Sequence, residues 1–187
     1  DLVKQTAAFA MRLRNKGCRK MIAVNFGVGG NSRKRVDGGF EEKLILRLLN
    51  EPGTVVLLDR GFGLEENERT AMIIATARNG RHFAKETAFG LFDGCETASG
   101  LIGISSGIGE VAECDEFIGY DSACQHIAAA LGVRTFTIFA GSNNPRFIRR
   151  WSACGSEKNE IIHVDTLTHP CPFDIDDVIA RVINVRT

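Results

Sequence analysis

Short apolar runs alternate with helix-forming segments along the whole chain. The runs at residues 21–26, 54–58, 101–104, 116–120, 134–139 and 161–164 show little polar alternation, which is typical of strands buried on both faces. The remaining periodic segments predict helices at residues 2–16, 40–50, 65–78, 108–114, 121–131 and 175–185. This order predicts an α/β fold, a Rossmann-like three-layer α/β/α arrangement with a parallel sheet of about six strands.

Composition excludes several classes of protein. The 187 residues suit a single domain spanning residues 1–187. Lys+Arg and Asp+Glu are both 23, and this zero net charge argues against a general nucleic-acid binder. No apolar run approaches the roughly 18–20 residues that span a bilayer, and the opening segment does not resemble a signal peptide. We therefore expect a cytoplasmic protein with no nucleic-acid partner and no transmembrane segment.

The cysteines and histidines give little support for a metal site. The six cysteines are scattered without C-x-x-C spacing, which favours reduced thiols in a cytosolic protein. A zinc site could draw on Cys124, His126, His163, His169 and Cys171, but these spacings match no usual ligand pattern. We expect no bound metal and no resident cofactor.

A glycine-rich, basic loop follows the first predicted strand. In a parallel sheet, ligands bind at the carboxyl ends of the strands, where such a loop lies. Glycines let the backbone approach an anion closely, and basic side chains add charge. The loop therefore predicts a phosphate site, although a solvated surface loop would have the same composition. The candidate contacts are Gly29, Gly30, Arg33, Lys34 and Arg35.

The same loop allows a second interpretation, a dinucleotide fingerprint. Gly27, Gly29 and Ser32 almost fit G-x-G-x-x-G/A, and Asp59 ends the second strand where a ribose-binding acid would lie. The serine at the third position and a helix start expected only near Phe40 count against it. An NAD-type domain stays open as an alternative.

Two further turns carry candidate ligands. Glu65 and Glu66 follow the second strand. They either interact favourably with the helix dipole in the first turn or present a carboxylate to ribose hydroxyls. After the fourth strand, a helix begins at a natural N-cap, Asp121 or Ser122, and its first N–H groups would face the carboxyl edge. A helix N-terminus with small residues suits a phosphate or diphosphate. The candidates in this second turn are Asp121, Ser122, Ala123, Cys124 and His126, the last of which could also be a packed histidine.

The segment from residue 121, D-S-A-C-Q-H-I-A-A-A-L-G-V-R-T, resembles D-[ST]-G-x-x-H-x-A-A-A-L-G-x-P-T of the family 9 glycosyltransferases, the bacterial lipopolysaccharide heptosyltransferases. In order along the chain, residues 34–36 resemble the K-R-W-P motif, residues 61–66 its G-x-x-x-E segment and residues 141–145 its G-x-T-x-P loop. Ala123, Arg134 and Val36 replace the family's Gly, Pro and Trp. These departures keep a non-catalytic nucleotide-sugar-binding module open as an alternative.

The resemblance implies one half of a two-domain GT-B enzyme. The chain starts at Asp1 without Met, and we expect it to be the C-terminal, donor-binding half, with the N-terminal acceptor half absent. The resemblance implies transfer of a sugar, such as heptose, with inversion and without metal, from an ADP- or UDP-linked donor. The acceptor would be a saccharide or lipid-linked saccharide at the inner membrane, and the catalytic base would come from the absent half.

The resemblance also implies roles for individual residues. Lys34 would neutralise the diphosphate, and Glu65 or Glu66 would hold the ribose. Asp121, the amides of residues 122–124 and His126 would bind the diphosphate and the sugar.

Overall fold

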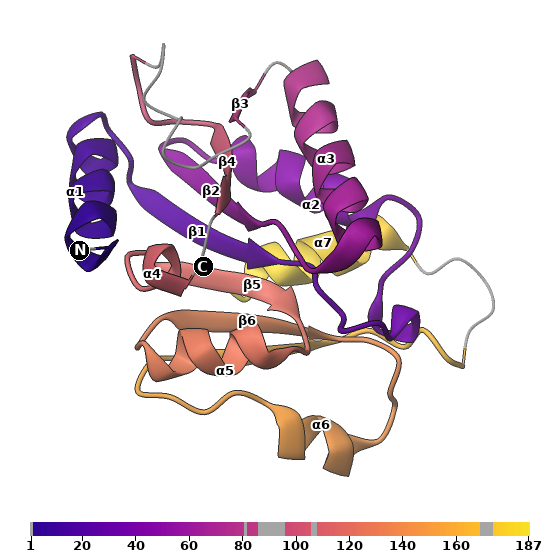
Figure 1. Cartoon of the computed structure of the whole chain (residues 1–187). Coiled ribbons are helices and arrows are strands. Elements are labelled where there is room, and N and C mark those ends of the chain that lie inside the picture. Colours follow the sequence, from indigo (N-terminus) through magenta and orange to yellow (C-terminus); the bar gives the residue numbers. More distant parts are fainter. Residues whose placement is uncertain (1, 81, 86–95, 106–107, 169–173) are drawn as a thin grey trace.

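The computed structural model describes residues 2–80, 82–85, 96–105, 108–168 and 174–187. It shows a central sheet with helices on both faces (Figure 1). The strands are β1 (Lys20–Asn25), β2 (Thr54–Asp59), β3 (Phe83–Lys85), β4 (Leu101–Ser105), β5 (Glu116–Tyr120), β6 (Arg134–Phe139) and β7 (Asn159–His163). The helices are α1 (Leu2–Asn15), the 3-10 turn η1 (Ser32–Lys34), α2 (Phe40–Leu49), α3 (Gly63–Asn79), α4 (Ile108–Val111), α5 (Ala123–Ala130), α6 (Pro145–Trp151) and α7 (Ile175–Asn184).

The strands pair in parallel throughout the described residues. Their order is β3-β4-β2-β1-β5-β6-β7 in one sheet of seven. All six predicted strands are present, and the added strand is the short edge strand β3. The order places β1 beside both β2 and β5, so the loops after these strands meet at one carboxyl edge. This confirms the predicted α/β class.

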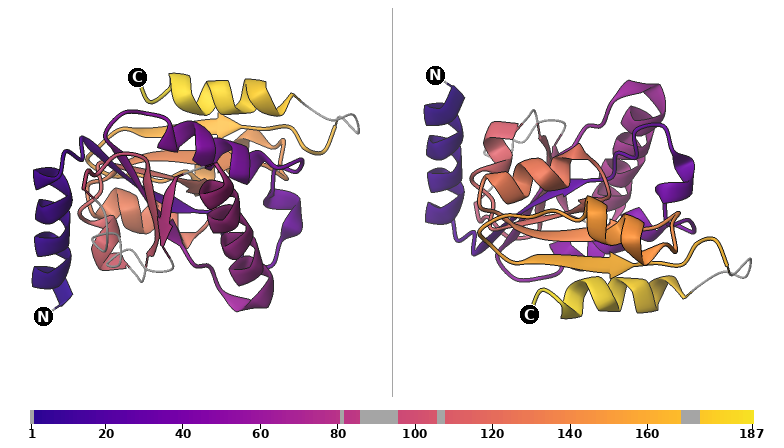
Figure 2. Two further views of the ribbon diagram at one scale, coloured as in Figure 1. Left: turned by 90° about the horizontal axis from the view of Figure 1, so that it is seen from above. Right: turned by 90° about the horizontal axis from the view of Figure 1, so that it is seen from below.

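Two apolar clusters, one on each face of the sheet, make the layers. In β1, Ile22 and Val24 belong to one cluster, while Met21 and Ala23 belong to the other, as the two-residue period of a strand requires. The first cluster packs α2, α3 and α7, and the second packs α1 and α5 (Figure 2). None of the described helices is both long and apolar enough to cross a membrane.

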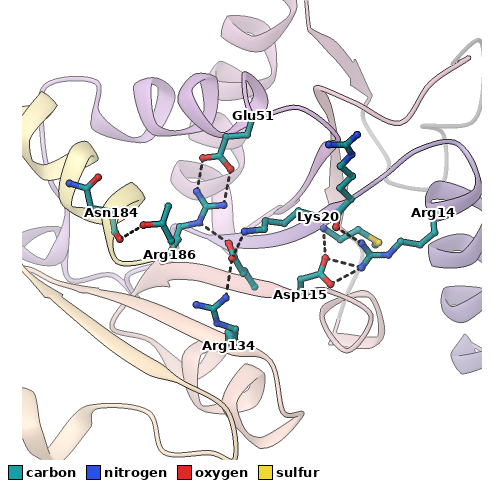
Figure 3. Close-up of polar contacts among 11 residues, drawn as sticks. Arg14, Lys20, Glu51, Asp115, Arg134, Asn184 and Arg186 are labelled. Atoms are coloured by element: carbon teal, nitrogen blue, oxygen red, sulfur yellow. Dashed lines mark hydrogen bonds and ion pairs between the residues drawn. The ribbon is translucent and has the colours of Figure 1, made fainter.

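A network of ion pairs around two buried residues, Glu116 and Arg186, lies at the amino edge of the sheet (Figure 3). Glu116, at the start of β5, is 1% exposed, and its carboxylate accepts hydrogen bonds from Lys20 and Arg186, both at 2.7 Å. Arg186 also donates to both oxygens of Glu51, at 2.9 and 3.0 Å. Arg134, at the start of β6, lies 3.7 Å from Glu116. The network ties α2, β1, β5, β6 and the end of α7 together.

A second cluster lies beside it, just before β5. Both oxygens of Asp115 accept from Arg14 at 2.8 Å, and one also accepts from the Met21 N–H at 2.7 Å. The neighbouring Cys114 is buried, and this burial raises the pKa of its thiol well above the ordinary value. The charged side chains of these two clusters therefore pair with one another at the amino edge.

Candidate functional site

At the opposite, carboxyl edge, the loops after β1, β5 and β6 surround an open cavity of about 440 Å³. Five of its lining residues are sequence candidates, and two aromatic residues come from α6. The lining residues are Lys34, Asp121, Ser122, Ala123, His126, Phe147 and Trp151. The structure thus brings together residues that lie more than a hundred positions apart.

An ion pair forms the floor of this cavity. The Lys34 Nζ lies 3.0 Å from Oδ2 of Asp121 and donates to the Asp121 carbonyl at 2.9 Å. The side chain of Lys34 is 24% exposed, whereas that of Asp121 is 9% exposed. The ammonium is therefore anchored on one side and open to the cavity on the other, which suits the neutralisation of an anion.

The loop after β6 supports the position of Lys34. Gly141, with a φ of 74°, lies so close to the η1 turn that a Cβ there would be 2.5 Å from the Arg33 carbonyl oxygen. The η1 turn itself is closed by the Asn31 side chain, which accepts from the Arg33 N–H at 3.3 Å. A glycine at residue 141 is thus required for the basic loop to rest against the sheet edge.

Gln125 links the ion pair to α6. Its side chain is fully buried, and Nε2 donates to Oδ1 of Asp121 at 2.9 Å and to the Trp151 carbonyl at 3.1 Å. Its Oε1 accepts from the Thr137 hydroxyl at 2.9 Å. One buried amide therefore fixes both the carboxylate that holds Lys34 and the end of the helix that forms the far wall.

The N-terminus of α5 opens beside the ion pair. Ser122 is the N-cap, but its hydroxyl lies 3.5 Å from Oδ1 of Asn25 and makes no capping bond. Ala123 is already helical, a conformation that alanine adopts freely, so the family's glycine is not required by the backbone here. His126 is exposed and lines the cavity rather than packing in the core.

Cys124 lies elsewhere. It lines a separate, mostly apolar cavity of about 80 Å³ on the other side of α5, together with Asn25, Asp59 and Ser105. Burial raises the pKa of the Cys124 thiol. Its side chain does not join the residues around Lys34.

Arg35 does not fit the expectation of a phosphate contact. Its side chain is 3% exposed and donates to Glu41 at 3.0 Å, inside the fold. Burial raises the pKa of Glu41, although the neighbouring Arg35 and Arg69 guanidinium groups oppose that rise. Lys34 therefore lines the cavity, whereas Arg35 is buried among three carboxylates, Glu41 at 3.0 Å and Glu65 and Glu66 both at 3.9 Å.

The other glycine and arginine candidates remain solvent-exposed. Gly29, Gly30 and Arg33 are exposed and do not line the cavity. The helix after this loop, α2, begins only at Phe40. The glycines therefore do not lead directly into a helix, as a dinucleotide fingerprint requires.

The two acidic residues after β2 differ in their surroundings. Glu66 accepts from the Val28 N–H at 3.0 Å and the Phe62 N–H at 2.7 Å, so it braces the start of the basic loop. The side chain of Glu65 is 71% exposed and lies 3.8 Å from Arg69. Of the two, Glu65 is the carboxylate open to a ligand.

Three residues of the site, Phe147, Trp151 and Gln125, were not predicted from the sequence. Phe147 and Trp151 lie on α6, a helix that the sequence patterns did not predict. It is capped by Asn144, whose side chain accepts from the Arg146 N–H at 3.0 Å. The N-P pair at its start was the available signal. Gln125 had no signal, because its importance lies in contacts with other strands and helices.

Two of the residues that depart from the family pattern, Arg134 and Val36, do not line the cavity. Arg134 lies at the amino edge, where it joins the Glu116 network far from the cavity. Val36 is buried, and its N–H donates to the Tyr120 hydroxyl at 3.1 Å. Neither change removes a residue that lines the cavity.

Among the described residues, no group of three or more His, Cys, Asp or Glu side chains is arranged to hold a metal ion. His169 and Cys171, two of the zinc candidates, lie outside the described residues.

Comparisons with known proteins agree with this architecture. The model of glycosyltransferase family 9 (heptosyltransferase) matches residues 65–172. None of the curated proteins matches the sequence.

Three solved structures share the fold at low sequence identity. The ADP-heptose lipopolysaccharide heptosyltransferase II of E. coli is 16% identical with a TM-score of 0.57, over 98% of this chain and 53% of that one. The E. coli heptosyltransferase WaaC with ADP is 14% identical with a TM-score of 0.58, over 97% and 48%. The C-terminal CMP-Kdo binding domain of WaaA from Acinetobacter baumannii is 12% identical with a TM-score of 0.53, over 99% and 90%.

The chain spans about half the length of the two heptosyltransferases and nearly the whole of the isolated domain. The family match covers more than half of the chain, and the parallel sheet agrees with the Rossmann-like halves of GT-B enzymes. The chain therefore belongs to glycosyltransferase family 9, the heptosyltransferase family.

Proposed function

We propose that this chain is the donor-binding domain of an inverting, metal-independent glycosyltransferase. It would bind a nucleoside-diphosphate sugar, ADP- or UDP-linked, whose sugar (such as heptose) passes to a saccharide or lipopolysaccharide acceptor. The observation that carries the proposal is the open cavity in which Lys34, Asp121 and the N-terminus of α5 converge. ADP in WaaC, and the name of heptosyltransferase II, favour an adenine nucleotide.

The charged groups have distinct roles in this proposal. The Lys34 ammonium and the first N–H groups of α5 stabilise the negative charge that grows on the leaving diphosphate. Asp121 orients Lys34 through the 3.0 Å ion pair, and His126 faces the same space. Glu65, the exposed carboxylate after β2, accepts hydrogen bonds from the ribose hydroxyls.

The reaction needs one more group. The bond between the anomeric carbon and the phosphate oxygen breaks, while an acceptor hydroxyl forms the new bond from the opposite face. The proton of that hydroxyl goes to a base, which we place in an acceptor-binding half outside this chain. The half-length match to the heptosyltransferases and the nearly full-length match to an isolated C-terminal domain support this division.

The whole enzyme, in this proposal, works in the cytoplasm at the inner membrane, where lipid-linked saccharides are available. The chain alone binds a donor and does not turn it over. Isothermal titration calorimetry of the folded chain with ADP, UDP, ADP-heptose and UDP-glucose tests the first claim. We expect at least one nucleotide to bind, whereas no binding by the whole panel would contradict the proposal.

The same titration separates the dinucleotide alternative. An NAD-type domain would bind NAD. Asp59→Ala would abolish this binding, and Lys34→Ala would leave the affinity for NAD unchanged. The donor-binding proposal expects the reverse dependence, with Lys34 essential to affinity and NAD a poor ligand.

A further inference from the structure

The wall of the cavity that faces away from β2 is aromatic. Phe147 and Trp151 lie one helical turn apart on α6, and their ring centroids are 6.3 Å apart. Their side chains remain 37% and 46% exposed, although both are large and apolar. Exposed aromatic residues beside a few polar groups are typical of ligand pockets.

The indole is held in place from several sides. Phe147 packs against it at a tilt of 49°, and the Arg150 guanidinium lies 5.8 Å from the ring centroid. The Trp151 carbonyl accepts from the buried Gln125, which also holds Asp121. The backbone at the end of α6 is therefore tied to the Lys34–Asp121 pair through Gln125.

The strand order decides which part of a donor would reach this wall. Glu65 follows β2, Lys34 follows β1, Asp121 follows β5 and α6 follows β6. In the sheet these strands are consecutive neighbours, in the order β2-β1-β5-β6, and adjacent strands lie about 4.8 Å apart. A ligand with its ribose at Glu65 and its diphosphate at Lys34 extends next toward α6.

We propose that Phe147 and Trp151 form the contact surface for the sugar ring of the donor, with Trp151 as the principal contact. This rests on the proposed function. The ligand class is a pyranose that presents an apolar C–H face to the indole, while its hydroxyls face Asp121 and His126. In this proposal the nucleoside of the donor makes its primary contacts elsewhere, near Glu65.

The chain offers a direct reporter, because Trp151 is its single tryptophan. The intrinsic fluorescence of the unmodified chain is titrated with ADP and ADP-heptose and with UDP and UDP-glucose, alongside calorimetry. For the nucleotide that binds most tightly, the sugar-linked form is expected to shift or quench the emission, and the free nucleotide to leave it nearly unchanged. Equal changes with both forms would overturn the assignment.

Trp151→Ala then measures the contact. It should weaken binding of the sugar nucleotide about five- to tenfold and change binding of the free nucleotide less than about twofold. Trp151→Phe, which keeps an aromatic face, should recover most of the loss. Met72→Ala, at a 60% exposed apolar residue on α3, is the matched control with no effect.

The outcomes separate the two levels of the argument. Absence of binding by every nucleotide contradicts the donor-binding proposal itself. If the unmodified chain binds and Trp151→Ala weakens binding of the free nucleotide and the sugar nucleotide equally, the wall contacts the nucleoside. If Trp151→Ala weakens neither, Trp151 makes no contact with the donor. Either result overturns this inference and leaves the donor-binding proposal intact.

Discussion

The two edges of the sheet use the same kinds of charged side chain in opposite ways. At the amino edge, Glu116 is 1% exposed, and its carboxylate forms ion pairs with Lys20, Arg134 and Arg186 inside the fold. At the carboxyl edge, Lys34 has one acidic partner and an open side facing a cavity. The comparison indicates that a charged group whose partners surround it stabilises the fold. A charged group with one partner and one side open to a cavity can still bind a ligand.

The largest effect is expected from Glu116→Ala. Removing this carboxylate leaves Arg186 and Lys20 near the buried edge without their shared acceptor, and breaking a buried pair typically costs about 3–5 kcal/mol. Urea unfolding should show this loss, while the remaining folded molecules keep their nucleotide affinity.

A matched control removes the same charge at a partly exposed pair. Glu160, whose side chain is 34% exposed, lies 2.8 Å from Lys158. Glu160→Ala should cost less than about 1 kcal/mol. Equal costs at the two positions would show that the amino edge is not the structural charge cluster described above.

Lys34→Ala should have the converse effect. Nucleotide binding measured by calorimetry is expected to weaken by about 1–3 kcal/mol, because a charged hydrogen bond to the diphosphate is lost. The free energy of unfolding should fall by less than for Glu116→Ala, because the carboxylate of Asp121 keeps its hydrogen bond from Gln125. Lys43→Ala controls for the loss of charge and should leave binding unchanged, because Lys43 is an exposed lysine on α2 that lies 3.5 Å from Asp176 on α7. A large loss of stability without a loss of affinity would reverse the roles assigned to the two edges.

Gln125→Leu tests whether the carboxyl edge is pre-organised. The change leaves Oδ1 of Asp121, the Thr137 hydroxyl and the Trp151 carbonyl without their shared partner, at a cost of about 1–2 kcal/mol in stability. Gln125→Glu keeps the hydrogen bond from Thr137 but places a second carboxylate beside Asp121. Both variants should weaken nucleotide binding, because neither holds Asp121 and the end of α6 as Gln125 does. If both variants bind nucleotide as the parent does, Gln125 does not position the site.

The smallest effect is a pH dependence at the amino edge. Burial raises the pKa of Cys114 above its ordinary value of 9.0, so the unfolded chain loses this proton first as the pH rises. The thiol's contribution to stability is complete below pH 9 and is lost above it, by about 1 kcal/mol at pH 10. Comparing Cys114→Ala with the parent between pH 7 and 10 isolates it, and Cys154→Ala, at an exposed thiol, should show no such trend.

Local sequence patterns were sufficient for most of the fold. Apolar runs without alternation predict buried parallel strands, and all six such runs became strands. The strand β3 has only three residues and α6 only seven, so neither carries a period long enough to detect. Their formation depends on the neighbouring strand β4 and on the Asn144 cap.

The site was only partly predictable for a related reason. Lys34 and Asp121 lie in loops directly after strands, and the rule that ligands meet the carboxyl edge selects them. The rule does not separate Lys34 from Arg35, although Lys34 lines the cavity and the adjacent Arg35 forms a buried ion pair with Glu41. Nor does it find Gln125, whose partners come from β6 and α6.

The order of the strands has a consequence for how donor preference could change. Contacts expected for the ribose, the diphosphate and the sugar follow β2, β1 with β5, and β6, each on its own connection. Exchanging the segment after β6 between family members should therefore alter which sugar is accepted while the nucleotide requirement stays as it was. The sheet would then act as a fixed frame on which one end of the donor site can be redesigned independently of the other.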